Sequence, residues 1–113
     1  MNWNDLNDIQ QLPLLDQESE STPILILKHS TRCSISAAAL SRLERNWQDS
    51  DSAVLKPYYL DLLQHRDVSN TIADLYSVEH QSPQVLVIKN GACVYSATHT
   101  EINYAELMSQ VRK

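Results

Sequence analysis

The chain has 113 residues, of which 42% are hydrophobic and 20% charged, and its formal net charge at pH 7 is -5. This length suffices for one domain, residues 1–113, with a core of its own. The acidic balance argues against non-specific nucleic-acid binding, and no apolar stretch approaches the roughly 20 residues of a membrane span. The first residues also lack the pattern of a signal peptide, so we expect a cytoplasmic protein with no nucleic-acid or membrane partner.

The first half of the chain predicts two helices around one strongly apolar strand. Residues 1–11 are polar and predict an irregular arm. A short helix is expected over 13–20, opening with a proline, which the first helical position tolerates. The strand is expected over 24–28, where four branched apolar residues run without interruption, as in a strand buried on both faces. A second helix is expected over 34–47, with apolar residues at steps of four and charges opposite.

A loop over 48–53 then leads to a predicted strand over 54–63. Within it, Pro57 indicates a sheet edge or a strand start, because proline cannot donate to a ladder. After a polar connection, Ser69 is expected to cap a short helix that holds Ile72, Ala73 and Tyr76.

The last third of the chain predicts a hairpin followed by a helix. Strands are expected over 84–88 and 92–98, on either side of Asn90-Gly91, a residue pair that favours a type I′ turn. The spacing of Asn103 and Glu106 is that of a capping box, which predicts a final amphipathic helix.

These elements predict an α/β fold. Strands joined through helices should pair in parallel, and the last two strands should form an antiparallel hairpin. We therefore expect a four-stranded mixed sheet flanked by helices, with a short extra helix in front.

Cys33 is the candidate reactive residue, because it falls where the first strand ends and a helix begins. Unpaired N–H groups and the helix dipole favour a negative charge there, and the thiolate is the nucleophilic form of cysteine. The neighbouring Arg32 and His29, four residues back, could add positive potential. The alternative is a small buried hydrophobe, as free cysteines often are. We interpret Cys93, in an apolar strand, as a core residue.

The spacing of the two cysteines restricts the expected chemistry to one thiol, and the spacing of the histidines bears on metal binding. Ser36 stands where a CxxC enzyme would hold its second cysteine, and it could equally serve as a residue of the first helical turn. Cys93 lies 60 positions away, so no structural disulfide is expected in a reducing compartment. The four histidines have no metal-ligand spacing with the cysteines, so we expect no metal site.

The order of elements, with a cysteine at the first strand–helix junction and a proline before the third strand, resembles the thioredoxin fold. A closer resemblance is to the YtxJ family, the monothiol bacilliredoxins of the bacillithiol redox system. Besides Ser36, it rests on four segments: Lys28-His29-Ser30-Thr31-Arg32-Cys33, Leu60-Asp61-Leu62, Arg66-Asp67-Val68-Ser69-Asn70, and His80-Gln81-Ser82-Pro83-Gln84-Val85-Leu86. The run from His80 to Gly91 is the most specific part. One departure is Ser34, since the family commonly has proline directly after the cysteine.

The resemblance implies a function and a substrate groove. Family members are proposed to remove bacillithiol from mixed disulfides on proteins, so the expected partners are a small thiol such as bacillithiol and S-thiolated client proteins. No cofactor is implied, because the low-molecular-weight thiol is a co-substrate. Pro83 would form a cis peptide bond and lie across from Cys33, with Ser82 and Thr31 in the groove. The supporting residues would be His29, Arg32, Ser34 and Ser36.

Two other functions fit the same residues. One is a non-catalytic thioredoxin-like stress or interaction protein, for which Cys33 would be inaccessible. The other is a thiol redox sensor, in which Cys33 would be capped without turnover.

Overall fold

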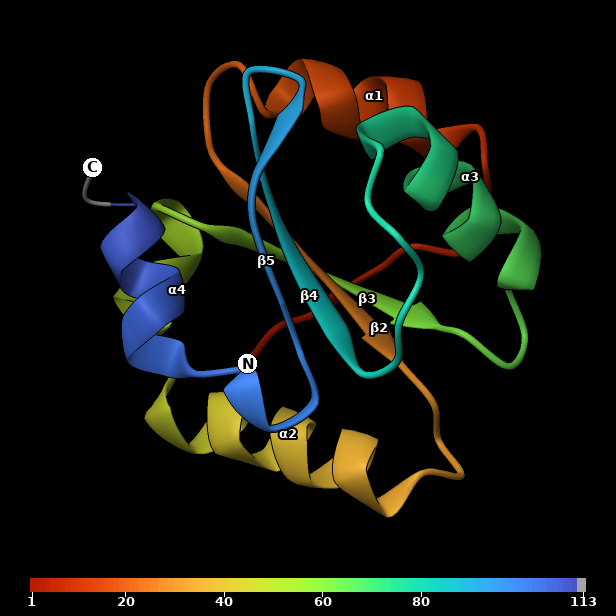
Figure 1. The fold of residues 1–113 in the computed structure, drawn as a ribbon. Helices are drawn as coiled ribbons and strands as arrows, with labels where there is room; N and C mark the ends of the chain where they lie inside the picture. Colours follow the sequence, from red (N-terminus) through yellow and green to blue (C-terminus); the bar gives the residue numbers. More distant parts are fainter. Residues whose placement is uncertain (112–113) are drawn as a thin grey trace.

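The computed structural model describes residues 1–111, which form a mixed sheet with helices on both faces (Figure 1). The five strands lie in the order β1-β3-β2-β4-β5. The elements run in chain order as β1 (Asn4–Asp5), α1 (Gln11–Glu18), β2 (Ile24–His29), α2 (Ser34–Asn46), the 3-10 helix η1 (Asp49–Ala53), β3 (Lys56–Asp61), α3 (Arg66–Tyr76), β4 (Gln84–Lys89), β5 (Ala92–Thr98), the 3-10 helix η2 (His99–Glu101) and α4 (Tyr104–Val111).

The central strand is β2, and all six of its residues are buried, which the apolar run predicts for the first four of them. It pairs in parallel with β3 and antiparallel with β4, while β4 and β5 form the expected hairpin. Asn90 and Gly91 have φ of 51° and 74° at its turn, as a type I′ turn requires. The topology expected for these strands is therefore confirmed.

The predicted count of four strands is wrong by one, because the polar arm contributes the short strand β1. Its two residues pair in parallel with Tyr58 and Tyr59 of β3. Asn4 also donates its side-chain amide to the Pro57 carbonyl, and Leu6 donates its N–H to the Tyr59 carbonyl. A strand of two residues is too short to show an alternation of apolar and polar residues in the sequence, so only its pairing with β3 identifies it as a strand.

β3 is shorter than predicted and begins next to Pro57. The Lys56 N–H donates to the Pro23 carbonyl on the β2 side at 2.9 Å. Because successive N–H groups of a strand point to opposite sides, the missing donor of Pro57 faces away from β2. The proline thus marks a strand start, one of the two readings its position allowed.

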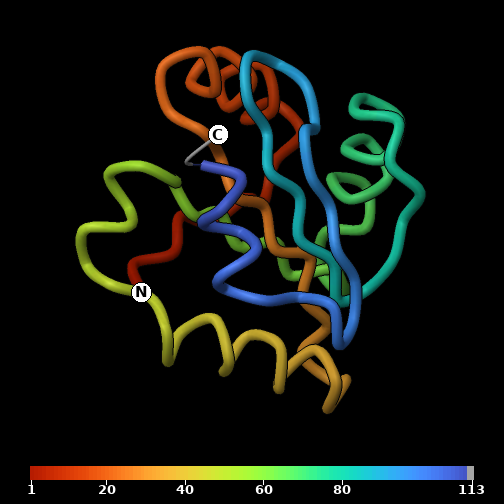
Figure 2. Tube along the Cα trace, turned by 60° about the vertical axis from the view of Figure 1, so that its left-hand side comes forward, coloured from red at the N-terminus to blue at the C-terminus, as the bar shows by residue number. Residues whose placement is uncertain are grey.

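The helices form two layers, with α1 and α3 on one face of the sheet and α2 and α4 on the other (Figures 1 and 2). Residues Ile24 and Ile26 of β2 pack in the core beneath the first pair, and Leu25 and Leu27 pack in the core beneath the second. None of the helices in the described part of the chain is long and apolar enough to cross a bilayer.

α1 begins two residues earlier than predicted, so Pro13 is its third residue. Gln11 accounts for this start, because its side-chain oxygen accepts the N–H groups of Asn7 and Asp8 and its amide donates to the Asp5 carbonyl. Proline is tolerated at the third position as well, since the first four N–H groups of a helix have no partner within it.

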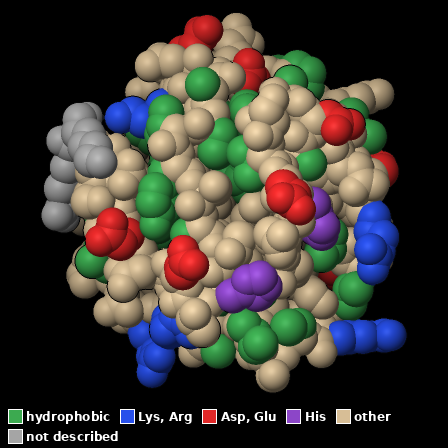
Figure 3. Space-filling model, viewed as in Figure 1, with side chains coloured by type: hydrophobic (Ala, Val, Ile, Leu, Met, Phe, Trp, Pro, Cys, Tyr) green, Lys and Arg blue, Asp and Glu red, His purple; other side chains and the backbone are tan. Residues whose placement is uncertain are grey.

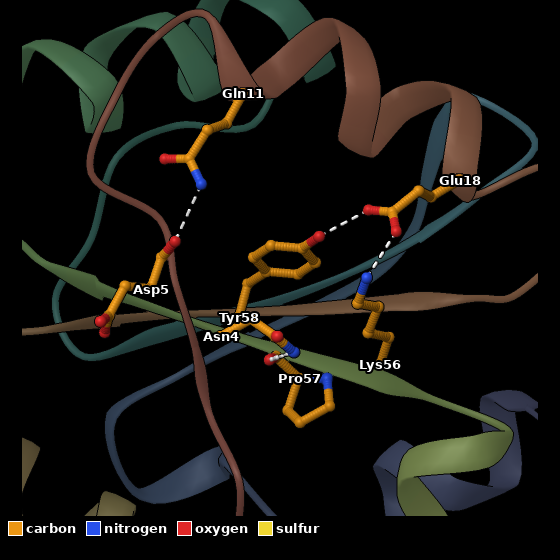
Figure 4. A network of polar contacts seen from close by, with 7 residues as sticks. All are labelled: Asn4, Asp5, Gln11, Glu18, Lys56, Pro57 and Tyr58. Atoms are coloured by element: carbon orange, nitrogen blue, oxygen red, sulfur yellow. Dashed lines mark hydrogen bonds and ion pairs between the residues drawn. The ribbon is translucent and has the colours of Figure 1, made fainter.

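A polar network joins the other end of α1 to β3 (Figure 4). The Glu18 carboxylate accepts hydrogen bonds from the Lys56 ammonium and the Tyr58 hydroxyl. Burial opposes the ionised carboxylate, but these two donors outweigh it and lower the pKa of Glu18.

The expectation that Ser69 caps α3 is wrong. The helix begins at Arg66, and the Ser69 N–H already donates to the His65 carbonyl at 3.2 Å. Ser69 is fully buried and faces the sheet. The predicted cap at Asn103 is confirmed, because its side-chain oxygen accepts the Glu106 N–H at 3.1 Å.

Candidate active site

Cys33 is the residue directly before α2, which begins at Ser34. Its backbone is extended, and its carbonyl accepts the N–H of Ala37 at 3.0 Å. Its own N–H donates to the Ser30 carbonyl at 3.1 Å, which closes a turn between β2 and α2. Cys33 is half-buried. The turn therefore holds it at a helix amino terminus, where unpaired N–H groups and the helix dipole stabilise an anion.

The buried Ser36 hydroxyl fixes this turn from inside. Its oxygen accepts the Ser30 N–H at 3.1 Å and lies 2.6 Å from His29 Nδ1. Burial lowers the pKa of His29, against the opposing effects of Asp61 and Glu44, and so favours the neutral ring. A neutral Nδ1 that accepts the Ser36 proton satisfies both groups.

Ser36 is therefore not presented to an incoming molecule. It is fully buried, and its hydrogen bonds go to the strand end rather than to the helix. Both expected supporting residues, His29 and Ser36, thus lie beneath the cysteine turn and brace it.

The three other sequence-predicted residues around the cysteine lie on the surface. Thr31, Arg32 and Ser34 are all exposed. None of them makes a side-chain hydrogen bond or ion pair within residues 1–111, so their side chains are open to an incoming partner.

The segment before β4 contains the predicted cis bond, between Ser82 and Pro83. Lys28 of β2 pairs with Gln84 of β4, so Pro83 lies at the end of β2 from which the chain runs to Cys33. Pro83 is buried, and its carbonyl accepts the His99 N–H at 3.0 Å. The buried Ser82 hydroxyl finds no hydrogen-bond partner among the described residues.

Sequence reasoning missed a second polar cluster at this end of the sheet. Lys28 is fully buried, and its Nζ lies 3.3 Å from the Ser69 carbonyl and 3.5 Å from His80 Nδ1. Burial lowers the pKa of Lys28 to about 8. A signal was available, because Lys28 shares the face of Ile24 and Ile26 in an alternating strand and must enter the α1/α3 core.

The second cysteine lies at the opposite end of the sheet. Cys93 pairs with Ile88, which pairs with Ile24, whereas Cys33 follows the other end of β2. Five strand steps separate these ends, or roughly 16 Å, well beyond the reach of a disulfide. Cys93 is half-buried and packs against the α1/α3 core, and burial raises the pKa of its thiol.

The surface around these elements carries mixed charge. Acidic and basic side chains are interspersed over the face that Figure 3 shows. Within residues 1–111, no group of three or more histidine, cysteine and acidic side chains is arranged to hold a metal ion.

Comparisons with known proteins agree with this arrangement. The chain is similar to a solved structure described as a candidate oxidoreductase with a thioredoxin fold, at 32% identity and a TM-score of 0.80, over 96% of this chain and 92% of that one. Fasciola hepatica thioredoxin has a TM-score of 0.72 at 16% identity, over 96% of each chain. Trypanosoma brucei brucei thioredoxin has a TM-score of 0.75 at 13% identity, over 98% of this chain and 88% of that one.

These likenesses define a thioredoxin-fold protein, and the cysteine between β2 and α2, together with the likeness to the candidate oxidoreductase, indicates a thiol redox function. The family model described as Monothiol bacilliredoxin BrxC matches residues 4–107. The chain therefore belongs to the monothiol bacilliredoxin family.

Proposed function

We propose that the protein is a monothiol thiol–disulfide oxidoreductase that removes a low-molecular-weight thiol, bacillithiol or a close analogue, from mixed disulfides on client proteins. The observation that supports this most is the isolation of Cys33. Its CxxC-equivalent position holds the buried Ser36, and Cys93 lies at the far end of the sheet. An intramolecular disulfide therefore cannot complete the reaction.

In the first step, the Cys33 thiolate attacks the small-thiol sulfur of the mixed disulfide. A bond forms between Cys33 Sγ and that sulfur, the bond to the client breaks, and the client leaves as a thiolate that takes a proton from water. The helix terminus stabilises the Cys33 thiolate at the start, and the braced turn keeps it in place.

In the second step, a second molecule of the small thiol attacks the adduct as its thiolate. A bond forms between its sulfur and the small-thiol sulfur of the adduct, the bond from that sulfur to Cys33 Sγ breaks, a symmetric small-molecule disulfide leaves, and the Cys33 thiolate is regenerated. The exposed Thr31 and Arg32, together with the backbone of Ser82 before the buried Pro83, would form the surface that receives the small thiol.

The test is multiple-turnover kinetics on a client peptide carrying one S-linked small thiol, run in parallel with bacillithiol and glutathione. The wild type should turn over, Cys33→Ser should be inactive, and the matched control Cys93→Ser should retain wild-type rates. Adduct formation on Cys33 without release of product would favour a redox sensor. A Cys33 that never reacts would favour a non-catalytic interaction protein.

A further inference from the structure

Lys28 is a buried ammonium with an unusual set of partners. Its side chain is fully buried, yet no carboxylate pairs with it within residues 1–111, where the one ion pair joins Lys56 and Glu18. Burying an unpaired charge is costly, and polar groups kept in such surroundings are candidates for a role in a functional site. The role follows from what Lys28 contacts.

Lys28 contacts α3, through the Ser69 carbonyl, and the segment between α3 and β4, residues 77–83, through His80. Nζ lies 3.5 Å from His80 Nδ1, and the Ser69 hydroxyl lies 3.1 Å from the same nitrogen. Gln84 holds Glu79, the residue before His80, because the Gln84 side-chain amide donates to the Glu79 carbonyl at 3.0 Å. Of these anchors, only Lys28 comes from β2, the strand that leads into the Cys33 turn.

The protonation states suit a donor–acceptor contact. Burial and the nearby cations Lys28 and Arg66 lower the pKa of His80, so its ring is neutral at pH 7 and Nδ1 can accept. With a pKa of about 8, Lys28 is still mostly protonated at pH 7 and donates. A proton on Nδ1 would replace the acceptor with a second donor facing Lys28 and break the contact.

We propose that Lys28 is a positioning residue for thiol exchange: through His80 it ties the 77–83 segment to β2, and so sets where Ser82 and Pro83 lie relative to Cys33, while its contact with the Ser69 carbonyl holds α3 to the same strand. This inference rests on the proposed function for its catalytic meaning. A binding surface made by two separate segments depends on such supports, because it contacts a bound molecule on both sides only while the two segments keep their places.

One test measures the segment directly and does not depend on activity. Lys28→Met removes the ammonium group and keeps an unbranched side chain one atom shorter, and Lys89→Met is the matched control at the other end of the sheet. Backbone order parameters at residues 79–82 should fall from about 0.85 to below about 0.6 in Lys28→Met. They should stay unchanged in Lys89→Met. Wild-type order in Lys28→Met would overturn the proposal.

A second test separates positioning from general damage. His80→Leu should loosen the same residues, and His80→Asn, whose side-chain oxygen replaces Nδ1, should restore them. In the exchange assay, Lys28→Met and His80→Leu should raise KM for the mixed disulfide about tenfold with kcat nearly unchanged. An unchanged KM in both variants would overturn the positioning role while leaving the proposed function standing.

If the wild type itself shows no exchange, the proposed function has failed. The order parameters then decide the structural part alone: ordered segments in Lys28→Met and His80→Leu refute the tie, and loosened segments support it.

Discussion

Removing the Ser36 hydroxyl should destabilise the protein more than its small volume suggests. In the folded protein this oxygen serves both the Ser30 N–H and His29 Nδ1. Ser36→Ala leaves the ring nitrogen of a side chain that is only 4% exposed without its partner. Ser30 is half-buried, so its N–H can partly recover a hydrogen bond to water.

The expected loss can be worked out from these two groups. A buried polar group left unpaired costs about 1–3 kcal/mol. A full penalty for His29 Nδ1 and part of one for the Ser30 N–H together come to about 2.5 kcal/mol. Alanine is a better helix former than serine by about 0.5 kcal/mol, which leaves a net loss of about 2 kcal/mol. For a domain of this size the melting temperature should fall by roughly 8 °C.

The assay is urea unfolding followed by circular dichroism, with Ser41→Ala as the control. Ser41 lies exposed on the same helix, so its substitution carries the same propensity change without the buried hydrogen bonds. We expect Ser41→Ala to lie within about 0.5 kcal/mol of the wild type. Equal unfolding free energies for the two variants would refute the inference that the hydrogen bonds of the Ser36 hydroxyl stabilise the turn.

The remaining predictions concern Cys93, Lys28 and Gly91. At pH 7 an alkylating reagent should label Cys33 at least about tenfold faster than Cys93, because burial raises the pKa of the Cys93 thiol; mass mapping of labelled peptides checks this, and equal rates would contradict it. The Lys28 pKa is about 8 in the folded state, below its ordinary value of 10.5, so the unfolded state binds more protons between these pH values. Wild-type stability should therefore rise with pH over this window by up to about 3 kcal/mol relative to Lys28→Met. Urea unfolding midpoints at several pH values test the sign of this pH dependence. If the midpoints of the wild type and Lys28→Met change with pH in parallel, the buried amine is not the cause of the pH dependence. Gly91→Ala should cost about 1–2 kcal/mol, since φ is +74° and the new Cβ would lie 3.2 Å from Asp16 Oδ2; an unfolding midpoint equal to that of the wild type would show that the turn tolerates it.

The sequence predicts those parts of the fold that local chemistry decides. The apolar run of β2, the turn at Asn90-Gly91 and the cap at Asn103 each carry their own signal, and all three are confirmed. β1 carries none, because its strand character comes from pairing with β3. Ser69 has the chemistry of a cap, but burial against the sheet places it inside α3.

The same distinction applies to the candidate site. The strand–helix junction at Cys33 follows from local pattern, so its place before α2 could be predicted. The partners of Lys28 lie 41 and 52 residues away in sequence, at Ser69 and His80, and only the folded chain brings them together. Likewise, the contact of Ser36 with His29 depends on how the turn closes.

The most direct test of the central claim is to identify which sulfur carries the small thiol after a single turnover. Equimolar protein and S-thiolated client peptide are mixed without free small thiol and analysed by intact mass and peptide mapping. The account predicts a free client thiol and one small-thiol adduct, located on Cys33 and absent in Cys33→Ser. An adduct on Cys93, or a client that keeps its small thiol, would contradict it.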